Sequence, residues 1–160
     1  MIKREAFEKL NSPQKEKVIN YFFNAKNPGF SSYPGITIDM PAGYSLRIAS
    51  LLVCEEQHHI LKKIFVVLEE SNTNIDSIDV ESIMTYAEDL KKTRQFNPEK
   101  DELWVIAAKK WTYEAYKQAQ GKIVFMDMNT LLDGINKYYP KKTKHARKLR
   151  NVLLYYGLIK

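Results

Sequence analysis

The sequence predicts an all-α protein of six to seven helices, and two observations carry that prediction. Apolar side chains recur at steps of three and four residues through most of the chain, which is the spacing of one face of an α-helix. Pairs such as Ser12-Pro13 and Asn97-Pro98, which are typical of helix starts, precede several of these stretches. With 44% apolar residues among its 160, the chain can also form a hydrophobic core.

The N-terminal part is predicted to hold two helices followed by a long loop. A short helix over 2–10 precedes a second one that Ser12 caps, with Pro13 at its first position, where the missing N–H costs nothing. Residues 27–43 hold three of the six prolines and three of the six glycines, which excludes a regular helix. We therefore expect a Pro/Gly-rich loop at 27–43, with a brief extended piece over 36–38.

The middle of the chain is predicted to be helical. Apolar residues over 44–70 recur around most of the girth of a helix, which indicates one long central helix or two joined end to end. A polar linker over 71–77 is followed by a helix over 79–96. A further helix opens at the start signal of Asn97 and ends at Gly121.

The C-terminal part is predicted to contain a short extended run and two helices. Residues 123–125 are extended, and Asp127 then caps a helix over 128–139. A short turn leads to the last helix, over 143–156, which Gly157 ends.

Positive charge is concentrated at one end of the chain. From residue 137 to residue 160 there are eight Lys or Arg and no Asp or Glu, whereas the first 136 residues carry a net charge of −2. This asymmetry indicates a local anionic partner, either nucleic acid or an acidic protein surface. Cys54 is the single cysteine, and no segment has the pattern of a signal peptide or the length of a membrane span, so we expect a cytoplasmic protein with no membrane partner.

The last two helices are similar to a helix-turn-helix, because a turn of about three residues joins them and the second helix is basic. From Pro98 onwards, the order of elements also resembles a winged-helix domain truncated before its wing hairpin. The outer face of the last helix carries cations and amide donors at steps of three and four, as contacts to phosphates and base edges require. The candidate nucleic-acid-binding residues are Lys141, Lys142, Lys144, Arg147, Lys148, Arg150 and Asn151.

Glu55, His58 and His59 form the densest set of candidate metal ligands. On a helix, a Glu-x-x-His step can bind iron or manganese, but bundles of that kind use the step twice. Because the step occurs once here, a polar surface patch is the favoured interpretation and a metal centre the alternative. Asp39 and Asp127 are not paired with a lysine at nuclease spacing, and no glycine-rich phosphate loop is present.

We therefore expect a non-enzymatic nucleic-acid-binding protein with a regulatory or accessory role, and DNA is favoured over RNA. The alternative is a protein-interaction module, such as an inhibitor, an immunity protein or a small complex subunit, that docks its basic end on an acidic partner. No cofactor is expected, and a homodimer stays open. The expected organisation is a helical body over 1–96 and a basic unit over 97–160, or one continuous domain.

Overall fold

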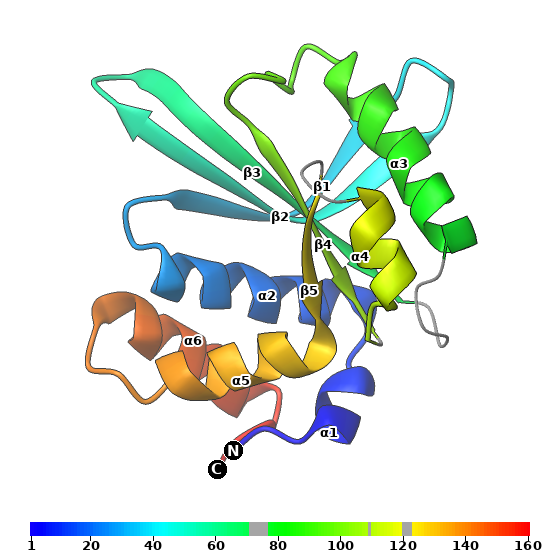
Figure 1. Ribbon diagram of the computed structural model, residues 1–160. Coiled ribbons are helices and arrows are strands. Elements are labelled where there is room, and N and C mark those ends of the chain that lie inside the picture. Colours follow the sequence, from blue (N-terminus) through cyan, green and yellow to red (C-terminus); the bar gives the residue numbers. More distant parts are fainter. Residues whose placement is uncertain (71–76, 109, 120–122) are drawn as a thin grey trace.

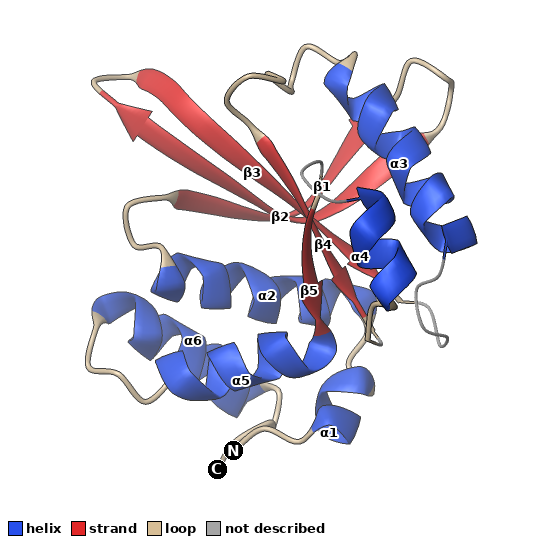
Figure 2. Ribbon diagram, in the orientation of Figure 1, coloured by secondary structure: helices blue, strands red, loops and turns tan. Residues whose placement is uncertain are grey.

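The protein is a three-layer structure in which helices cover both faces of one mixed β-sheet (Figures 1 and 2). The computed structural model describes residues 1–70, 77–108, 110–119 and 123–160, and the side chains of 77–79 are not described. The described elements, in chain order, are α1 (Arg4–Glu8), α2 (Ser12–Lys26), β1 (Ser31–Asp39), β2 (Ser45–Glu56), β3 (His59–Glu69), α3 (Ser77–Lys91), β4 (Glu102–Ala107), α4 (Tyr113–Ala119), β5 (Val124–Asp127), α5 (Met128–Tyr138) and α6 (Lys144–Tyr155).

The sheet contradicts the predicted all-α fold. Its five strands lie in the order β1-β2-β3-β4-β5, with β1, β2 and β3 antiparallel to one another and β4 and β5 parallel to β3. The predictions of a helix-turn-helix and of a truncated winged-helix-like unit are wrong as well, since the last two helices pack on this sheet together with α2. The division predicted between 1–96 and 97–160 stays a prediction, and strands of the one sheet come from both sides of it.

Two hydrophobic cores lie on opposite faces of the sheet. Helices α1, α2, α5 and α6 cover one face, and α3 and α4 cover the other (Figure 1). The largest fully buried side chains of the first core include Phe7, Phe22, Phe23 and Leu131. Those of the second core include Phe65, Leu90 and Trp111.

The segment predicted as one long helix over 44–70 is the β2–β3 hairpin. A strand that is buried on both faces is apolar along its whole length, so its pattern overlaps with that of a helix that is apolar all round. The hairpin turns at Gln57 and His58, whose φ angles are 50° and 66°. Such a turn favours Gly or Asn, and neither residue stands here to indicate it in the sequence.

The helix predicted from Asn97 to Gly121 is a strand followed by a shorter helix. The side chain of Asn97 accepts a hydrogen bond from the backbone N–H of Glu99 at 3.0 Å, as in a helix cap, but the chain then enters β4. Strand β4 lies between β3 and β5, with Trp104 packed in one core and Val105 in the other. The predicted end of this helix at Gly121, like most of the predicted linker over 71–77, lies outside the described residues.

Several predicted elements are confirmed. Helices α2, α5 and α6 and the extended run before Asp127 are present, although Asn11 caps α2 in place of Ser12. The predicted loop over 27–43 is wrong in part, because most of it forms β1. Strand β1 is at the edge of the sheet, where Pro34 does not interrupt a ladder on its outer side. No helix in the described ranges is long and apolar enough to cross a membrane.

Candidate nucleic-acid interface

The basic C-terminal segment includes the end of α5 and the whole of α6, two helices that lie beneath the sheet in Figure 1. The carboxylate of Asp127 accepts a hydrogen bond from the N–H of Thr130 at 2.8 Å and begins α5. The hydroxyl of Thr143 accepts one from the N–H of Ala146 at 3.1 Å and begins α6. Gly157, with a φ of 71°, ends α6 in the left-handed conformation that glycine adopts without strain.

Helix α6 has one buried and one exposed face. Ala146, Leu149 and Leu153 are buried in the core that α6 shares with α2 and α5. The opposite face is exposed, and its residues are Lys144, Arg147, Lys148, Asn151 and Tyr155. The helix therefore presents cations and an amide to solvent at steps of three and four residues.

The turn between α5 and α6 carries two more exposed lysines, Lys141 and Lys142. The Lys141 ammonium lies 4.3 Å from the centroid of the Tyr138 ring, a cation–π contact that keeps it near the surface of α5. Arg150 has a different place from the other candidate residues, because it is half-buried. Its Nη1 donates to the carbonyl oxygens of Tyr139 and Lys141, at 2.6 and 2.8 Å, and so holds the turn.

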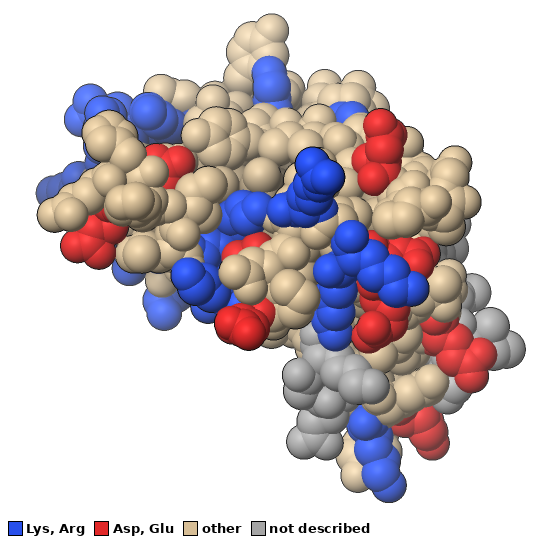
Figure 3. All heavy atoms as spheres, turned by 90° about the horizontal axis from the view of Figure 1, so that it is seen from above, with Lys and Arg blue, Asp and Glu red and all other residues tan. Residues whose placement is uncertain are grey.

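The cations of this segment have no acidic partners among the described residues. None of the eight Lys and Arg over 137–160 forms a salt bridge with a described Asp or Glu. At the end of the sheet where β4 begins, in contrast, Lys62 pairs with Glu102 and Lys63 lies 3.9 Å from Asp101. Figure 3 shows the molecule of Figure 1 from above. On that face, basic side chains (blue) and acidic side chains (red) are interspersed. The exposed cations on α5, α6 and the turn between them, which do not include Arg150, therefore lack an acidic partner among the described residues and are available to an external anion.

A shallow groove lies between α2 and α6. Its volume is about 340 Å³, and its lining residues are Tyr21, Lys148, Asn151, Val152 and Tyr155. The Tyr155 side chain is 85% exposed, whereas the neighbouring Tyr156 is half-buried. Tyr21 was not among the residues that the sequence singled out, since only the packing of α2 on α6 brings it here.

A row of polar contacts joins α2 to the sheet. The carboxylate of Glu16 accepts two hydrogen bonds from the Arg47 guanidinium, at 2.8 and 2.9 Å. One turn further along α2, the buried Asn20 accepts a hydrogen bond from the hydroxyl of Ser50 at 2.8 Å. This row lies where β2 begins to pair with β3, because that pairing starts at Ser50.

The same row continues at the start of α2. The Lys15 ammonium and the Ser12 hydroxyl both donate to the carboxylate of Glu70, at 2.7 and 2.8 Å. None of the residues in this row was predicted as a site from the sequence. Its signal was present, since Glu16 and Asn20 stand four residues apart among the apolar residues of α2, where polar side chains need partners.

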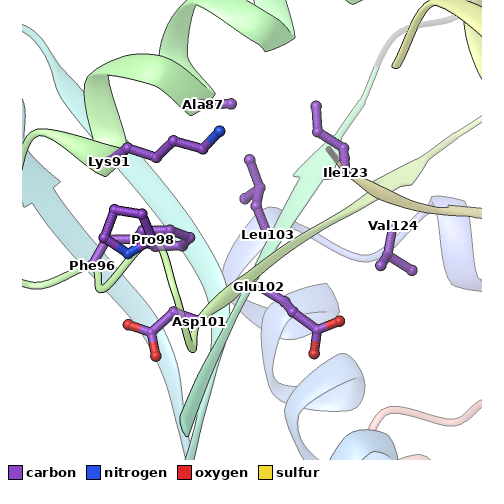
Figure 4. A pocket seen from close by; sticks show the side chains of 9 residues that line it. All are labelled: Ala87, Lys91, Phe96, Pro98, Asp101, Glu102, Leu103, Ile123 and Val124. Carbon is purple, nitrogen blue, oxygen red and sulfur yellow. The ribbon is translucent and has the colours of Figure 1, made fainter. Parts of the chain in front are cut away.

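A second hollow, of about 390 Å³, opens where α3 ends and β4 begins, and Figure 4 shows its lining side chains. Phe96, Pro98 and Leu103 make one side of it apolar, and Lys91 reaches across it (Figure 4). The carboxylate of Asp101 also lines the hollow, but it accepts hydrogen bonds from the N–H groups of Lys63 and Asn97. It therefore holds the loop before β4 in place.

The weak metal candidates Glu55, His58 and His59 lie at the tip of the β2–β3 hairpin, not on a helix. All three side chains are exposed. Within the described ranges, no group of three or more His, Cys, Asp or Glu side chains is placed to hold a metal ion. The helical Glu-x-x-His arrangement is therefore absent.

No family model matches the sequence, and no curated protein matches it. The fold is similar to the crystal structure of a protein of unknown function, AF1548, with a TM-score of 0.56 and 13% identity over 92% of this chain and 97% of that one. It is also similar to the MspJI restriction endonuclease in complex with a 27-mer oligonucleotide, with a TM-score of 0.51 and 10% identity over 90% of this chain and 32% of that one.

A repair endonuclease from Pyrococcus abyssi matches with a TM-score of 0.46 and 17% identity, over 75% of this chain and 47% of that one. At such low identities the similarity concerns the fold alone: a mixed α/β sheet with helices on both faces.

Proposed function

We propose that the protein binds nucleic acid, with DNA favoured over RNA, through a basic surface on α5, α6 and the turn between them. This basic surface comprises Lys137, Lys141, Lys142, Lys144, Arg147 and Lys148. One observation carries the proposal: all six side chains are exposed, and none pairs with a described acid. A surface of one sign attracts a polyanion, because phosphate contacts release the counterions condensed on DNA.

The geometry of α6 supports contact with a duplex. Lys144, Arg147 and Asn151 lie at steps of three and four on one exposed face, so their side chains project in the same direction. Lysines can contact phosphates there, and the Arg and Asn side chains can form paired hydrogen bonds with base edges. The fold similarity to a restriction endonuclease solved with an oligonucleotide agrees with this proposal.

We also propose that binding is the whole of this activity and that the protein does not cleave its target. The carboxylates of the polar row are already engaged, with Glu16 bound to Arg47 and Glu70 bound to Lys15 and Ser12. A carboxylate held in this way is less available to position a metal or a water. Incubation of supercoiled plasmid with the protein and Mg²⁺ or Mn²⁺ should leave the plasmid intact, and nicking that follows the protein through purification would contradict this second proposal.

The binding proposal is tested by the salt dependence of duplex affinity. We expect the logarithm of the association constant to fall linearly with the logarithm of salt concentration, by about 0.9 for each phosphate contacted. The double substitution Lys144→Ala with Lys148→Ala should reduce that slope by about 2, since two contacts are lost. Fluorescence anisotropy with a labelled duplex measures both quantities.

The matched control removes two lysines elsewhere. Lys92 and Lys100 are exposed near the end of α3 and the start of β4, so Lys92→Ala with Lys100→Ala changes the net charge equally. The control should keep the wild-type slope. Equal effects of the two double substitutions would show attraction by net charge alone, and no binding to any DNA or RNA at low salt would overturn the proposal in favour of an acidic protein partner.

A further inference from the structure

We propose that the groove between α2 and α6 holds an unpaired nucleobase, so that the protein binds single-stranded or frayed nucleic acid in addition to duplex. The proposal rests on the proposed nucleic-acid function and assigns one nucleotide to the groove lined by Tyr21, Lys148, Asn151, Val152 and Tyr155. The occupant is a base whose phosphate lies toward the basic surface.

Tyr155 is the central observation, because folding does not account for its position. Its side chain is 85% exposed, although an aromatic ring of this size is usually buried at least in part. It lies on the last turn of α6, and its ring makes an edge contact with the half-buried Tyr156 at a centroid distance of 5.6 Å. Tyr156 therefore contacts one part of the Tyr155 ring, while most of the ring meets solvent.

The other lining residues fit the parts of a nucleotide. Lys148 is seven residues before Tyr155 on α6 and thus on the same side of the helix, where its ammonium can contact a phosphate. Asn151 lies between them and carries both a donor and an acceptor, as the edge of a base requires. Tyr21 on α2 closes the groove from the other side.

The lining of the groove favours a nucleotide over an apolar ligand, because it joins an exposed aromatic ring to a cation and an amide. The groove is shallow, with a volume of about 340 Å³, and a flat ring such as a base can lie in it against Tyr155. The groove adjoins the basic surface through Lys148, which belongs to both. Stacking on an aromatic ring is independent of base identity, because every base has a π-face.

The test compares a single-stranded oligothymidine of about 12 nucleotides with a blunt duplex, at one salt concentration. We expect Tyr155→Ala to weaken single-strand binding by about 10-fold or more and to leave duplex affinity unchanged. Tyr155→Phe keeps the ring and should bind as the wild type does. Tyr113→Ala is the matched control, since Tyr113 is 77% exposed on α4, on the other face of the sheet.

A second readout reports stacking directly. An oligonucleotide that contains 2-aminopurine should lose fluorescence on binding to the wild type and to Tyr155→Phe, and should lose much less on binding to Tyr155→Ala. If duplex binds with the expected salt slope while Tyr155→Ala equals the wild type on single strands, the groove proposal alone fails. If neither single strand nor duplex binds at low salt, the groove proposal and the proposed function fail together.

Discussion

Arg47 and Glu16 are joined by two parallel hydrogen bonds, yet they meet very different amounts of solvent. The Glu16 side chain is 6% exposed and the Arg47 side chain 55% exposed. The hydrogen bonds to Glu16 raise the pKa of Arg47, although partial burial acts in the opposite direction. The pair ties α2 to β2, and a side chain at the neighbouring Gly35 would lie 2.7 Å from Arg47 Nη2.

This unequal exposure predicts unequal effects of breaking the pair from its two sides. Arg47→Ala leaves a buried carboxylate without its partner, and we expect the free energy of unfolding to fall by about 3 kcal/mol. Glu16→Gln leaves an exposed guanidinium that water can solvate, and we expect a loss of about 1 kcal/mol. Urea denaturation measures both values, and a larger loss for Glu16→Gln than for Arg47→Ala would contradict the interpretation.

The Lys15–Glu70 contact predicts a pH dependence of stability. Burial by itself raises the pKa of Glu70, but the hydrogen bonds from Lys15 and Ser12 and the charge of Lys15 outweigh it and lower the pKa. A carboxyl group whose pKa is lower in the folded than in the unfolded state stabilises the fold above its unfolded pKa of about 4.3. That contribution is lost as the pH falls through the folded pKa.

Lys15→Met tests this relationship because it keeps the aliphatic stem and removes the ammonium. We expect the melting temperature of the variant to match that of the wild type more closely at pH 3 than at pH 7. Melting curves followed by circular dichroism across this range give the difference. A difference in melting temperature between the two proteins that is the same at all pH values would contradict this prediction, because it would indicate lost packing alone.

Most strands could not be predicted from the sequence, and two regions show the physical reason. Residues of β2 and β4 alternate between two cores, so apolar residues stand at consecutive positions, and such runs also satisfy helical spacing. Asn97-Pro98 has the chemistry of a helix cap but closes a turn, in which the N–H of Asn97 donates to the carboxylate of Asp101 at 2.7 Å. The helices that were correctly predicted, α5 and α6, each have one polar and one apolar face.

The candidate site was predictable only where it follows one helix. Lys144, Arg147, Lys148 and Asn151 are exposed on α6, and helical spacing alone places them together. The groove could not be predicted, because Tyr21 is more than 100 residues away in sequence and joins it through tertiary packing. Whether these residues bind nucleic acid stays a prediction.

We expect a side chain at Gly134 in α5 to conflict with the packing of Phe22. A Cβ atom at this position would lie 2.6 Å from Cζ of Phe22, which is 1% exposed and in ring contact with Phe23 and Tyr138. Alanine would favour the helix by about 1 kcal/mol relative to glycine, whereas overpacking costs about 1–3 kcal/mol. We therefore expect Gly134→Ala to lower the free energy of unfolding by about 1 kcal/mol.

A double-mutant cycle separates the two contributions. Phe22→Leu shortens the side chain that the new methyl group would meet, so Gly134→Ala made in the Phe22→Leu protein should be neutral or stabilising. Chemical denaturation of the four proteins gives the coupling. Additive losses would show that Gly134 is required for another reason.

We expect Arg150 and Arg147, which lie on the same helix, to have different roles. The guanidinium of Arg150 donates to the carbonyl groups of Tyr139 and Lys141, just beyond the C-terminal end of α5, where a positive charge is favoured. Arg147 is exposed one turn earlier on α6. Arg150→Ala should lower the free energy of unfolding by about 1.5 kcal/mol, because carbonyl groups lose a charged donor. Arg147→Ala should change it by less than about 0.5 kcal/mol.

Their effects on duplex binding should be in the opposite order. Removal of Arg147 takes one exposed cation from the basic surface, and we expect the salt slope of duplex affinity to fall by about 1. Arg150→Ala should change that slope less, because the guanidinium of Arg150 is occupied by hydrogen bonds within the protein. This variant is assayed well below its own melting temperature. A slope reduced more by Arg150→Ala than by Arg147→Ala would mean that the turn between α5 and α6, and not the exposed face of α6, is the main contact with the nucleic-acid backbone.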